Sequence, residues 1–470
     1  MKPSRTISDI VDELGVGPAQ VRLVLLAGGI NWVVGTEMPL YGTLPRSVAE
    51  HLDVGPYCRA LLLSGAVAGM MFGNCAGLLS DRYFARRKPI FLSYMCGIFF
   101  AVASTSCSSY GCVLLCWAAS AFGLGFGVPT WSALASEASP STRRMDVAGF
   151  SWMLFSAGSL SVMLVQYVYH PDLNFGAKWR EVLLWTQVPC LLLFAAALTI
   201  GFVDSAHVLA AQGRHADAQE VLETMRRLNG RPEVCVEYEV SKPGKGVSLR
   251  EGYLALFSRH RRCVTMVLCL LTFTLNLTSY GTLYAEGVVL PSLELGVPTS
   301  LVLVMNPISD LLGNLCGVAL SKAVSRRSMM LSYGGLAGIY YVVLIFGLAR
   351  LAEYKFDILG STLVLAVAMT FKFVLAIGWL SVYTYTTEAF PTLCRTFATG
   401  FIMGCGRLGS ICAPLVLEHL HLATECHWSF FSLVVCLVVL NMLLVVLCLP
   451  ETKGLQLEGF LGELQPLNGK

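Results

Sequence analysis

Apolar runs of about twenty residues dominate this chain, and each is long enough to cross the hydrocarbon core of a bilayer. Lipid offers no hydrogen-bond partner to the backbone, so such runs must be helices. The chain is therefore expected to be an all-α membrane protein with twelve transmembrane helices in two six-helix halves. We place the spans at about 21–43, 57–80, 89–107, 110–134, 146–168, 181–203, 263–285, 298–321, 329–350, 359–386, 397–417 and 428–449.

Composition supports a membrane protein and excludes other classes. Hydrophobic residues make up 55% of the 470 residues and charged residues 13%, against about 25% charged in soluble domains. A net charge of +3 is too small to suggest a nucleic-acid partner. Most of the seventeen cysteines lie in apolar runs, which indicates that they pack as small hydrophobic residues. The pattern indicates neither a disulfide framework nor a zinc site. No enzyme motif, cofactor or metal site is predicted.

The polar segments divide the chain into five parts. We expect a cytoplasmic N-terminal amphipathic segment at 1–20, an N-terminal six-helix bundle at 21–203 and a cytoplasmic linker with short helices at 204–262. A C-terminal six-helix bundle at 263–449 and a cytoplasmic tail at 450–470 follow.

Lysine and arginine are concentrated in the loops on one side of the predicted spans. Cytoplasmic loops carry an excess of these residues, so both termini are expected in the cytoplasm. The basic residues assigned to that side are Arg82, Arg86, Arg87, Lys88, Arg143, Arg144, Lys322, Arg326, Arg327 and Arg395. The other side has Arg46, Arg59, Lys178, Arg180, Arg350 and Lys355.

Several motifs resemble those of the major facilitator superfamily of solute transporters. They are GLLSDRYFARRK (Gly77–Lys88), DIVDELGVGPAQ (Asp9–Gln20), WREVLLWTQVP (Trp179–Pro189), YTYTTEAFPTLCR (Tyr383–Arg395) and the Pro-Glu-Thr-Lys-Gly ending at 450–454. Together they are similar to the organic ion and synaptic-vesicle-glycoprotein-related branch. The short first external loop, about 44–56, favours the synaptic-vesicle-related side. The resemblance implies a transporter in which spans one, four, seven and ten line a central cavity.

The sequence departs from the branch at three places. The loop after the second span reads Tyr83-Phe84-Ala85 where relatives have a glycine, Ala119 replaces an arginine, and Val203-Asp204-Ser205 replaces Pro-Glu-Ser.

The resemblance also implies cytoplasmic gate motifs that hold the helix ends together. A carboxylate at a helix N-terminus is stabilised by about 0.3–1 kcal/mol, and Asp81 has such a place. We predict gate pairs between Glu137 and Arg143 or Arg144, and between Glu388 and Arg395. The whole gate set is Gly77, Asp81, Arg82, Arg86, Arg87, Glu137, Arg143, Arg144, Glu388 and Arg395. The alternative is that the basic residues only anchor the topology.

Two charged residues stand out inside the spans. Glu37 lies in the first span with Tyr41 on its helix face, and a charge at that depth costs at least about 2.5 kcal/mol. We interpret it as a proton or substrate site; the alternative is a solvated residue at the outer mouth. Lys372 shares a face of the tenth span with Trp379 and Tyr383 and could approach Glu37 in the cavity that the resemblance implies. Its alternative is a lysine that snorkels to the interface.

Further candidates lie in the seventh and eleventh spans. Arg407 resembles the arginine of organic anion transporters and could bind a carboxylate or sulfate in bidentate fashion. The alternative is a structural tie to a carbonyl group or to Asp310. Asn276 and Tyr280 are the expected cavity residues of the seventh span. One cluster is interpreted as a solvated external loop rather than a metal site: Glu418, His419, His421, Glu425 and His427.

These observations favour a carrier for a small polar or charged organic solute, an organic anion being favoured, with possible proton coupling left open. The alternatives are a sugar porter and a transport-inactive receptor or interaction protein. The expected partners are the solute, a proton and the lipid bilayer, without nucleic acid, and the monomer is expected to function alone.

Overall fold

The computed structural model contains helices and no strand within the residues that it describes. These are 5–80, 85–140, 143–173, 175–238, 254, 256–258, 261–289, 291, 298–351, 358–390, 392–426 and 428–450. The chain forms two compact units, Met1–His170 with Asn174–Gly244 and Pro171–Leu173 with Lys245–Lys470. We call them the first and second unit.

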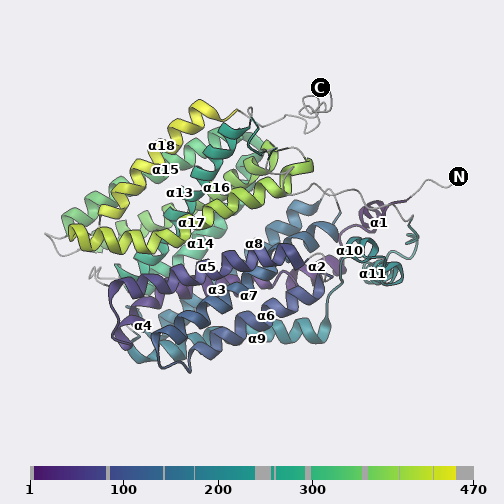
Figure 1. Cartoon of the computed structure of the whole chain (residues 1–470), viewed down its shortest axis with the longest axis horizontal. Coiled ribbons are helices and arrows are strands. Elements are labelled where there is room, and N and C mark those ends of the chain that lie inside the picture. Colours follow the sequence, from purple (N-terminus) through teal and green to yellow (C-terminus); the bar gives the residue numbers. More distant parts are fainter. Residues whose placement is uncertain are drawn as a thin grey trace. The chain divides into compact units, whose positions relative to one another are not determined.

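The first unit holds the helices up to α11 (Figure 1). They are α1 (Ile7–Leu14), α2 (Pro18–Leu26), α3 (Ile30–Thr43), α4 (Pro45–His51), α5 (Pro56–Ser80), α6 (Arg87–Ser104), α7 (Tyr110–Glu137), α8 (Arg144–Tyr169), α9 (Trp179–Ile200), α10 (Ala206–Ala211) and α11 (His215–Leu228). The second unit contains α13 (Arg262–Val288), α14 (Thr299–Ala323), α15 (Arg326–Leu351), α16 (Ile358–Ala389), α17 (Thr392–Thr424) and α18 (Ser429–Cys448).

Ten helical stretches among the described residues are long and apolar enough to cross a membrane. They are α2 with α3, α5, α7, α8, α9, α13, α14, α15, α17 and α18. Helices also occupy the third and tenth predicted spans, as α6 and α16. The all-helical membrane character predicted from hydropathy is confirmed.

The helix pairs follow the same order in both units. In the first, α3 packs against α8, α5 against α7, and α6 against α7 and α9. In the second, α13 packs against α17, α14 against α16, and α15 against α16 and α18. If α2 and α3 count as one span, then in each unit the first span packs against the fifth, the second against the fourth, and the third against the fourth and the sixth. This is the pattern of an internal repeat.

Close approach between α5 and α7 depends on glycines that recur every fourth residue, at 69, 73 and 77. A Cβ atom at Gly69 would lie 2.1 Å from the carbonyl oxygen of Ala118, and one at Gly73 would lie 2.1 Å from that of Phe122. Small residues at this spacing allow membrane helices to pack backbone against backbone. A larger side chain at either position must push the helices apart.

The first predicted span is interrupted between α2 and α3, which differs from the single helix expected over 21–43. Gly28 and Gly29 lie at the break, where an added Cβ atom would meet the ring of Trp131 at Gly28 and the hydroxyl group of Tyr94 at Gly29. The hydroxyl group of Tyr94 donates a hydrogen bond of 2.9 Å to the carbonyl oxygen of Leu26. A side chain from α6 thus satisfies a carbonyl group at the break.

Two further expectations are wrong. The predicted last external loop is shorter, because α17 continues to Thr424 and includes Glu418, which is fully buried. No proline follows Pro414 in that stretch to end the helix. The expectation of no disulfide framework also needs correction at one place, because Cys107 and Cys112 form a disulfide. Cys107 lies in the turn after α6 and Cys112 in the first turn of α7, where hydropathy alone gave no indication of pairing.

Candidate functional site

Glu37 lies in the interior of the first unit, in the middle of α3. Both it and Gln187 of α9 are fully buried, and the Gln187 amide donates a hydrogen bond of 2.7 Å to Glu37 Oε1. Among the described residues, no cationic side chain forms an ion pair with Glu37 within 4.0 Å. The buried position does not fit the alternative of a solvated residue at an outer mouth. The sequence analysis does not single out Gln187, although it lies in the motif Trp179–Pro189.

An aromatic pair extends this site along α3. Tyr41 follows Glu37 by one turn, is fully buried and interacts electrostatically with the carboxylate. The centroid of its ring lies 5.2 Å from that of Trp117, a residue of α7. Glu37 Oε2 has no hydrogen-bond partner within normal geometry among the described residues. We call Glu37, Tyr41 and Gln187 the carboxylate site.

Lys372 of α16 forms an ion pair inside the second unit. Its Nζ atom lies 3.2 Å from Oε2 of Glu286, near the C-terminal end of α13. The Nδ2 atom of Asn306 on α14 donates a 3.2 Å hydrogen bond to the same oxygen. The exposed fractions of the Lys372 and Glu286 side chains are 13% and 11%, so the pair is largely buried. A snorkelling lysine would extend to water, so the alternative does not fit.

Glu286 was missed because it lies just beyond the predicted end of the seventh span. Solvated residues also occur at the ends of apolar runs, so nothing in the sequence pairs Glu286 with Lys372. Lys372 and Glu37, which were expected to approach each other, belong to different units. Within its own unit, Lys372 pairs with Glu286, and Glu37 accepts a hydrogen bond from Gln187.

Arg407 of α17 interacts with aromatic hydroxyl groups. It donates a 2.8 Å hydrogen bond from Nη1 to the hydroxyl oxygen of Tyr280 on α13, and Tyr383 of α16 lies within electrostatic range. The ring of Trp379 lies 5.7 Å from that of Tyr383. Among the residues that the structure describes, Arg407 forms no ion pair with a carboxylate. We call Arg407, Tyr280 and Tyr383 the arginine site.

Polar contacts continue along the interface between α13 and α17. Asn276 accepts a hydrogen bond of 2.7 Å from Ser410 and donates one of 2.8 Å to the carbonyl oxygen of Thr272. Tyr284 donates a hydrogen bond of 2.7 Å to Glu418. The predicted residues Asn276 and Tyr280 therefore both form hydrogen bonds with α17, and Tyr280 is the one that bonds to Arg407.

The predicted gate motifs are only partly described. Glu137 at the end of α7 forms a double contact with Arg86, of 2.7 Å from Nη2 to Oε1 and 3.2 Å from Nε to Oε2. Arg143 is exposed just before α8, where Arg144 is the first helical residue. Asp81 and Arg82 lie outside the described residues, as do the side chains of Glu388, Arg395 and Arg144. Gly77 packs against the backbone of α7.

Asp204, in the departure Val203-Asp204-Ser205, anchors the beginning of α6. Its Oδ1 atom accepts hydrogen bonds from the backbone N–H groups of Arg87 and Ser205, at 3.3 and 2.8 Å. Burial raises the pKa of Asp204 above its ordinary value, although these hydrogen bonds act in the opposite direction. Asp204 thus connects the start of the polar segment that follows α9 to the first residue of α6.

The motif at Asp9–Gln20 has a structural role that the sequence did not reveal. The side chain of Asn229, at the end of α11, accepts a hydrogen bond of 3.0 Å from the backbone of Ala19 and donates one of 3.0 Å to Gln20. Gln20 in turn donates to the carbonyl oxygen of Ala138, at 3.1 Å. In Figure 1, α1, α10 and α11 gather at one end of the first unit, with α4 at the other. Asn229 joins this end to α7.

The comparisons agree with this architecture. The family model described as "Sugar (and other) transporter" matches residues 51–461. The svop-1 protein of Caenorhabditis elegans is 24% identical over 433 residues, covering 88% of this chain and 79% of that protein. Solute carrier family 22 member 7 of Mus musculus is 28% identical over 406 residues, covering 83% and 68%. The predicted resemblance to the organic ion and synaptic-vesicle-related branch is confirmed.

A solved structure confirms the predicted fold. The inward-open xylose transporter XylE of E. coli superposes with a TM-score of 0.73 at 16% identity, covering 94% of this chain and 98% of that one. At this identity the similarity concerns the fold alone. The chain therefore has the major facilitator fold.

Proposed function

Because the chain belongs to the sugar (and other) transporter family, and so is a multi-pass membrane transporter and not an enzyme, we propose that it carries a small organic anion by alternating access. The proposal assigns the arginine site to the solute and the carboxylate site to a coupled proton. It keeps both termini in the cytoplasm and takes the monomer as the functional form.

The observation that carries this proposal is that Arg407 has a neutral hydrogen-bond partner and no carboxylate partner among the described residues. A guanidinium group is always charged and binds carboxylate or sulfate groups through parallel hydrogen bonds. Arg407 is held in place by the neutral hydroxyl group of Tyr280 and forms no ion pair with a described carboxylate. Its positive charge therefore remains available to a ligand, with Tyr383 within electrostatic range and Trp379 packed against Tyr383.

Lys372 has a different role in this proposal. Its charge is offset by Glu286, so binding an anion there would leave Glu286 without its partner. Removing one partner from a buried pair is strongly unfavourable. We therefore assign Lys372 to the framework of the second unit, and Arg407 to the solute.

Glu37 supports proton coupling. A carboxylate buried without a cationic partner is costly, and Glu37 has only neutral partners among the described residues. Loss or gain of a proton there changes how well Gln187 and Tyr41 satisfy the carboxyl group. The solved neighbour XylE is described as a proton:xylose symporter, which makes proton coupling worth testing in this chain.

The test is uptake into proteoliposomes of a panel of radiolabelled carboxylates, organic cations and neutral sugars, with and without an inward proton gradient. We expect at least one carboxylate to be carried, and Arg407→Gln to reduce its uptake more than tenfold. Arg214→Gln is the matched control, since Arg214 forms an exposed ion pair with Asp217 of α11. Uptake of neutral sugars alone would overturn the proposal in favour of a sugar porter. Ligand binding without counterflow would favour a transport-inactive receptor.

The role of Glu37 is tested separately. We expect Glu37→Gln to abolish the dependence of uptake on the proton gradient while retaining counterflow of the same solute. Full gradient dependence in the Glu37→Gln protein would overturn the proton assignment without affecting that of Arg407.

A further inference from the structure

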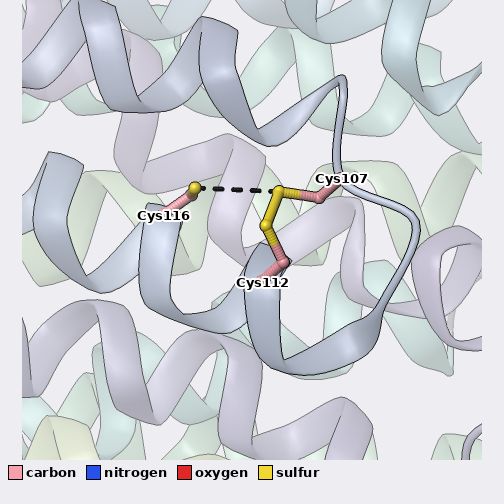
Figure 2. Close-up of side chains that lie close together, drawn as sticks. All are labelled: Cys107, Cys112 and Cys116. Atoms are coloured by element: carbon pink, nitrogen blue, oxygen red, sulfur yellow. Dashed lines mark hydrogen bonds between the residues drawn. A yellow bond between two sulfur atoms is a disulfide. The ribbon is translucent and has the colours of Figure 1, made fainter.

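Three cysteines meet at the turn between α6 and α7 of the first unit (Figure 2). Cys107 and Cys112 form a disulfide, and the Sγ atom of Cys116 lies 3.8 Å from that of Cys107. All three sulfur atoms lie within 4.8 Å of one another. The third cysteine is thus a free thiol in van der Waals contact with an existing disulfide. Nothing in the proposed transport function uses it.

The geometry points to a thiol–disulfide exchange site in which Cys107 changes its partner from Cys112 to Cys116. The Cys116 thiol loses its proton, and its sulfur attacks Sγ of Cys107. A new Cys107–Cys116 bond forms while the Cys107–Cys112 bond breaks, and the electron pair of the broken bond leaves on Cys112, which takes up a proton. The numbers of disulfides and thiols do not change, so the step needs no external oxidant or reductant.

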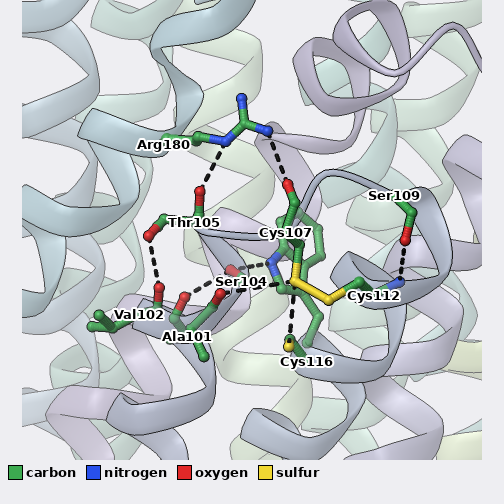
Figure 3. Close-up of a disulfide and its surroundings, with 11 residues drawn as sticks. Ala101, Val102, Ser104, Thr105, Cys107, Ser109, Cys112, Cys116 and Arg180 are labelled. Atoms are coloured by element: carbon green, nitrogen blue, oxygen red, sulfur yellow. Dashed lines mark hydrogen bonds between the residues drawn. A yellow bond between two sulfur atoms is a disulfide. The ribbon is translucent and has the colours of Figure 1, made fainter.

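Helix geometry explains why both partners reach the same sulfur atom. Cys112 and Cys116 are four residues apart at the start of α7, so they lie on one face of that helix. Cys107 approaches this face from the preceding turn. The oxygen of the Ser109 side chain caps α7 by accepting a hydrogen bond from the backbone of Cys112 (Figure 3). The positive end of the helix dipole favours the Cys112 thiolate as the leaving group.

The turn is fixed so that Cys107 stays between its two partners. Arg180, next to the first residue of α9, donates hydrogen bonds of 2.9 Å to the carbonyl oxygens of Thr105 and Cys107 (Figure 3). Its guanidinium group lies over the ring of Trp179, 4.7 Å from the centroid. Attack on Cys107 requires the Cys116 sulfur to lie in line with the Cys107–Cys112 bond, so exchange requires a rotation of the cysteine side chains while these hydrogen bonds hold the backbone at Cys107.

Exchange changes which thiol can be modified. Cys112 is exposed, whereas Cys107 is buried and Cys116 is only partly exposed. In the first pairing the exposed position is blocked by the disulfide. In the second pairing Cys112 is a free and accessible thiol, which makes it a modification site for small thiol-reactive molecules.

The exchange site is also connected to the carboxylate site. Cys116 precedes Trp117, whose ring packs against Tyr41 next to Glu37, and whose Nε1 atom donates a 3.3 Å hydrogen bond to Ser104 at the end of α6. A change of pairing at Cys116 would therefore alter the packing of Trp117 against Tyr41. This connection rests on the proposed function, whereas the exchange itself does not.

The experiment measures exchange directly on the purified full-length protein without reductant. The protein is incubated with N-ethylmaleimide, quenched in acid, digested with pepsin under non-reducing conditions and mapped by mass spectrometry. In the wild type we expect a Cys112 adduct to accumulate together with an equal amount of the Cys107–Cys116 linkage. Cys116→Ser should label at Cys112 at least tenfold more slowly, and its Cys107–Cys112 linkage should persist.

Two further variants make the result decisive. Cys75→Ser alters an exposed cysteine of α5 and should behave as the wild type. In Cys112→Ser, mild oxidation should form the Cys107–Cys116 linkage, which supports the geometry even if Cys116→Ser does not fold. The inference is overturned if Cys112 labels equally fast with and without Cys116, or if Cys112→Ser forms no Cys107–Cys116 linkage. Uptake assays are not needed for either result.

Discussion

Replacing Glu286 by glutamine should destabilise the second unit, because Lys372 would then be largely buried without its counter-charge. The two atoms of the pair are 3.2 Å apart, and the side chains are 11% and 13% exposed. Removing one partner of a buried pair costs about 3–5 kcal/mol. Because a little water reaches this pair, we expect the lower end, about 3 kcal/mol.

The expected loss can be measured as a thermal shift. A change of 1 kcal/mol lowers the unfolding midpoint by about 2–4 °C in a domain of 150–250 residues, so Glu286→Gln should lower it by about 6–12 °C. The assay is thermal unfolding in detergent, followed by intrinsic fluorescence. Glu223→Gln is the control, since it breaks a more exposed pair with Arg226; the side chains of Arg226 and Glu223 are 31% and 39% exposed. Exposed pairs contribute about 0–1 kcal/mol, so this shift should be small.

A second substitution tests the cause of the loss. Lys372→Met removes the uncompensated charge, so the double variant Glu286→Gln/Lys372→Met should recover at least half of the stability lost by Glu286→Gln. Additive losses in the double variant, or a shift for Glu286→Gln no larger than that for Glu223→Gln, would refute the reasoning.

Three further perturbations have defined outcomes. Gly69→Val should push α5 away from α7 and prevent recovery of monodisperse protein in size-exclusion chromatography. Gly149→Val is the control and should be tolerated, because no atom lies within 4 Å of an added Cβ atom there. Equal recovery of the two variants would contradict the close packing of α5 and α7. Asn229→Ala should leave the Ala19 N–H without its acceptor, at a cost of about 1–3 kcal/mol, and speed hydrogen exchange in α1 and α2, whereas unchanged exchange would exclude this role. Hydrogen bonds from Thr6 lower the pKa of Asp9 below its ordinary 3.8. The stabilisation of α1 by the Asp9 carboxylate is therefore complete above pH 3.8 and is lost as the pH falls through the lower folded-state pKa. Hydrogen-exchange protection of α1 that is independent of pH in this range would argue against this role.

The positions of the helices could be predicted from the sequence because a bilayer imposes a simple condition. A span must be long and apolar, and its backbone must be satisfied internally, so hydropathy alone marks where it begins and ends. The exceptions are local. The break between α2 and α3 depends on Trp131 and Tyr94 from other helices, and α17 extends past its predicted end because Glu418 finds a buried partner in Tyr284.

The candidate residues could be named from the sequence, but their partners could not. A charge inside an apolar run is conspicuous, since burial of a charge is costly wherever it lies, and this identified Glu37, Lys372 and Arg407. Their partners are separated from them by long stretches of chain, 150 residues from Glu37 to Gln187 and 127 from Arg407 to Tyr280. Neither spacing nor composition specifies which distant polar residue comes within hydrogen-bond distance.

The sequence by itself determined that this chain is a bundle of membrane-spanning helices with a few costly charges inside, because hydrophobic length and charge burial are properties of single segments. Tertiary structure alone decided which partner each of these groups has: Glu286 for Lys372, a neutral amide for Glu37, and for Arg407 a hydroxyl group that leaves its charge uncompensated. The same holds for the cysteines, whose meeting depends on a turn that brings α6 to α7. The physical reason is that pairing energies fall off within a few ångströms, so they depend on packing between helices and not on order along the chain.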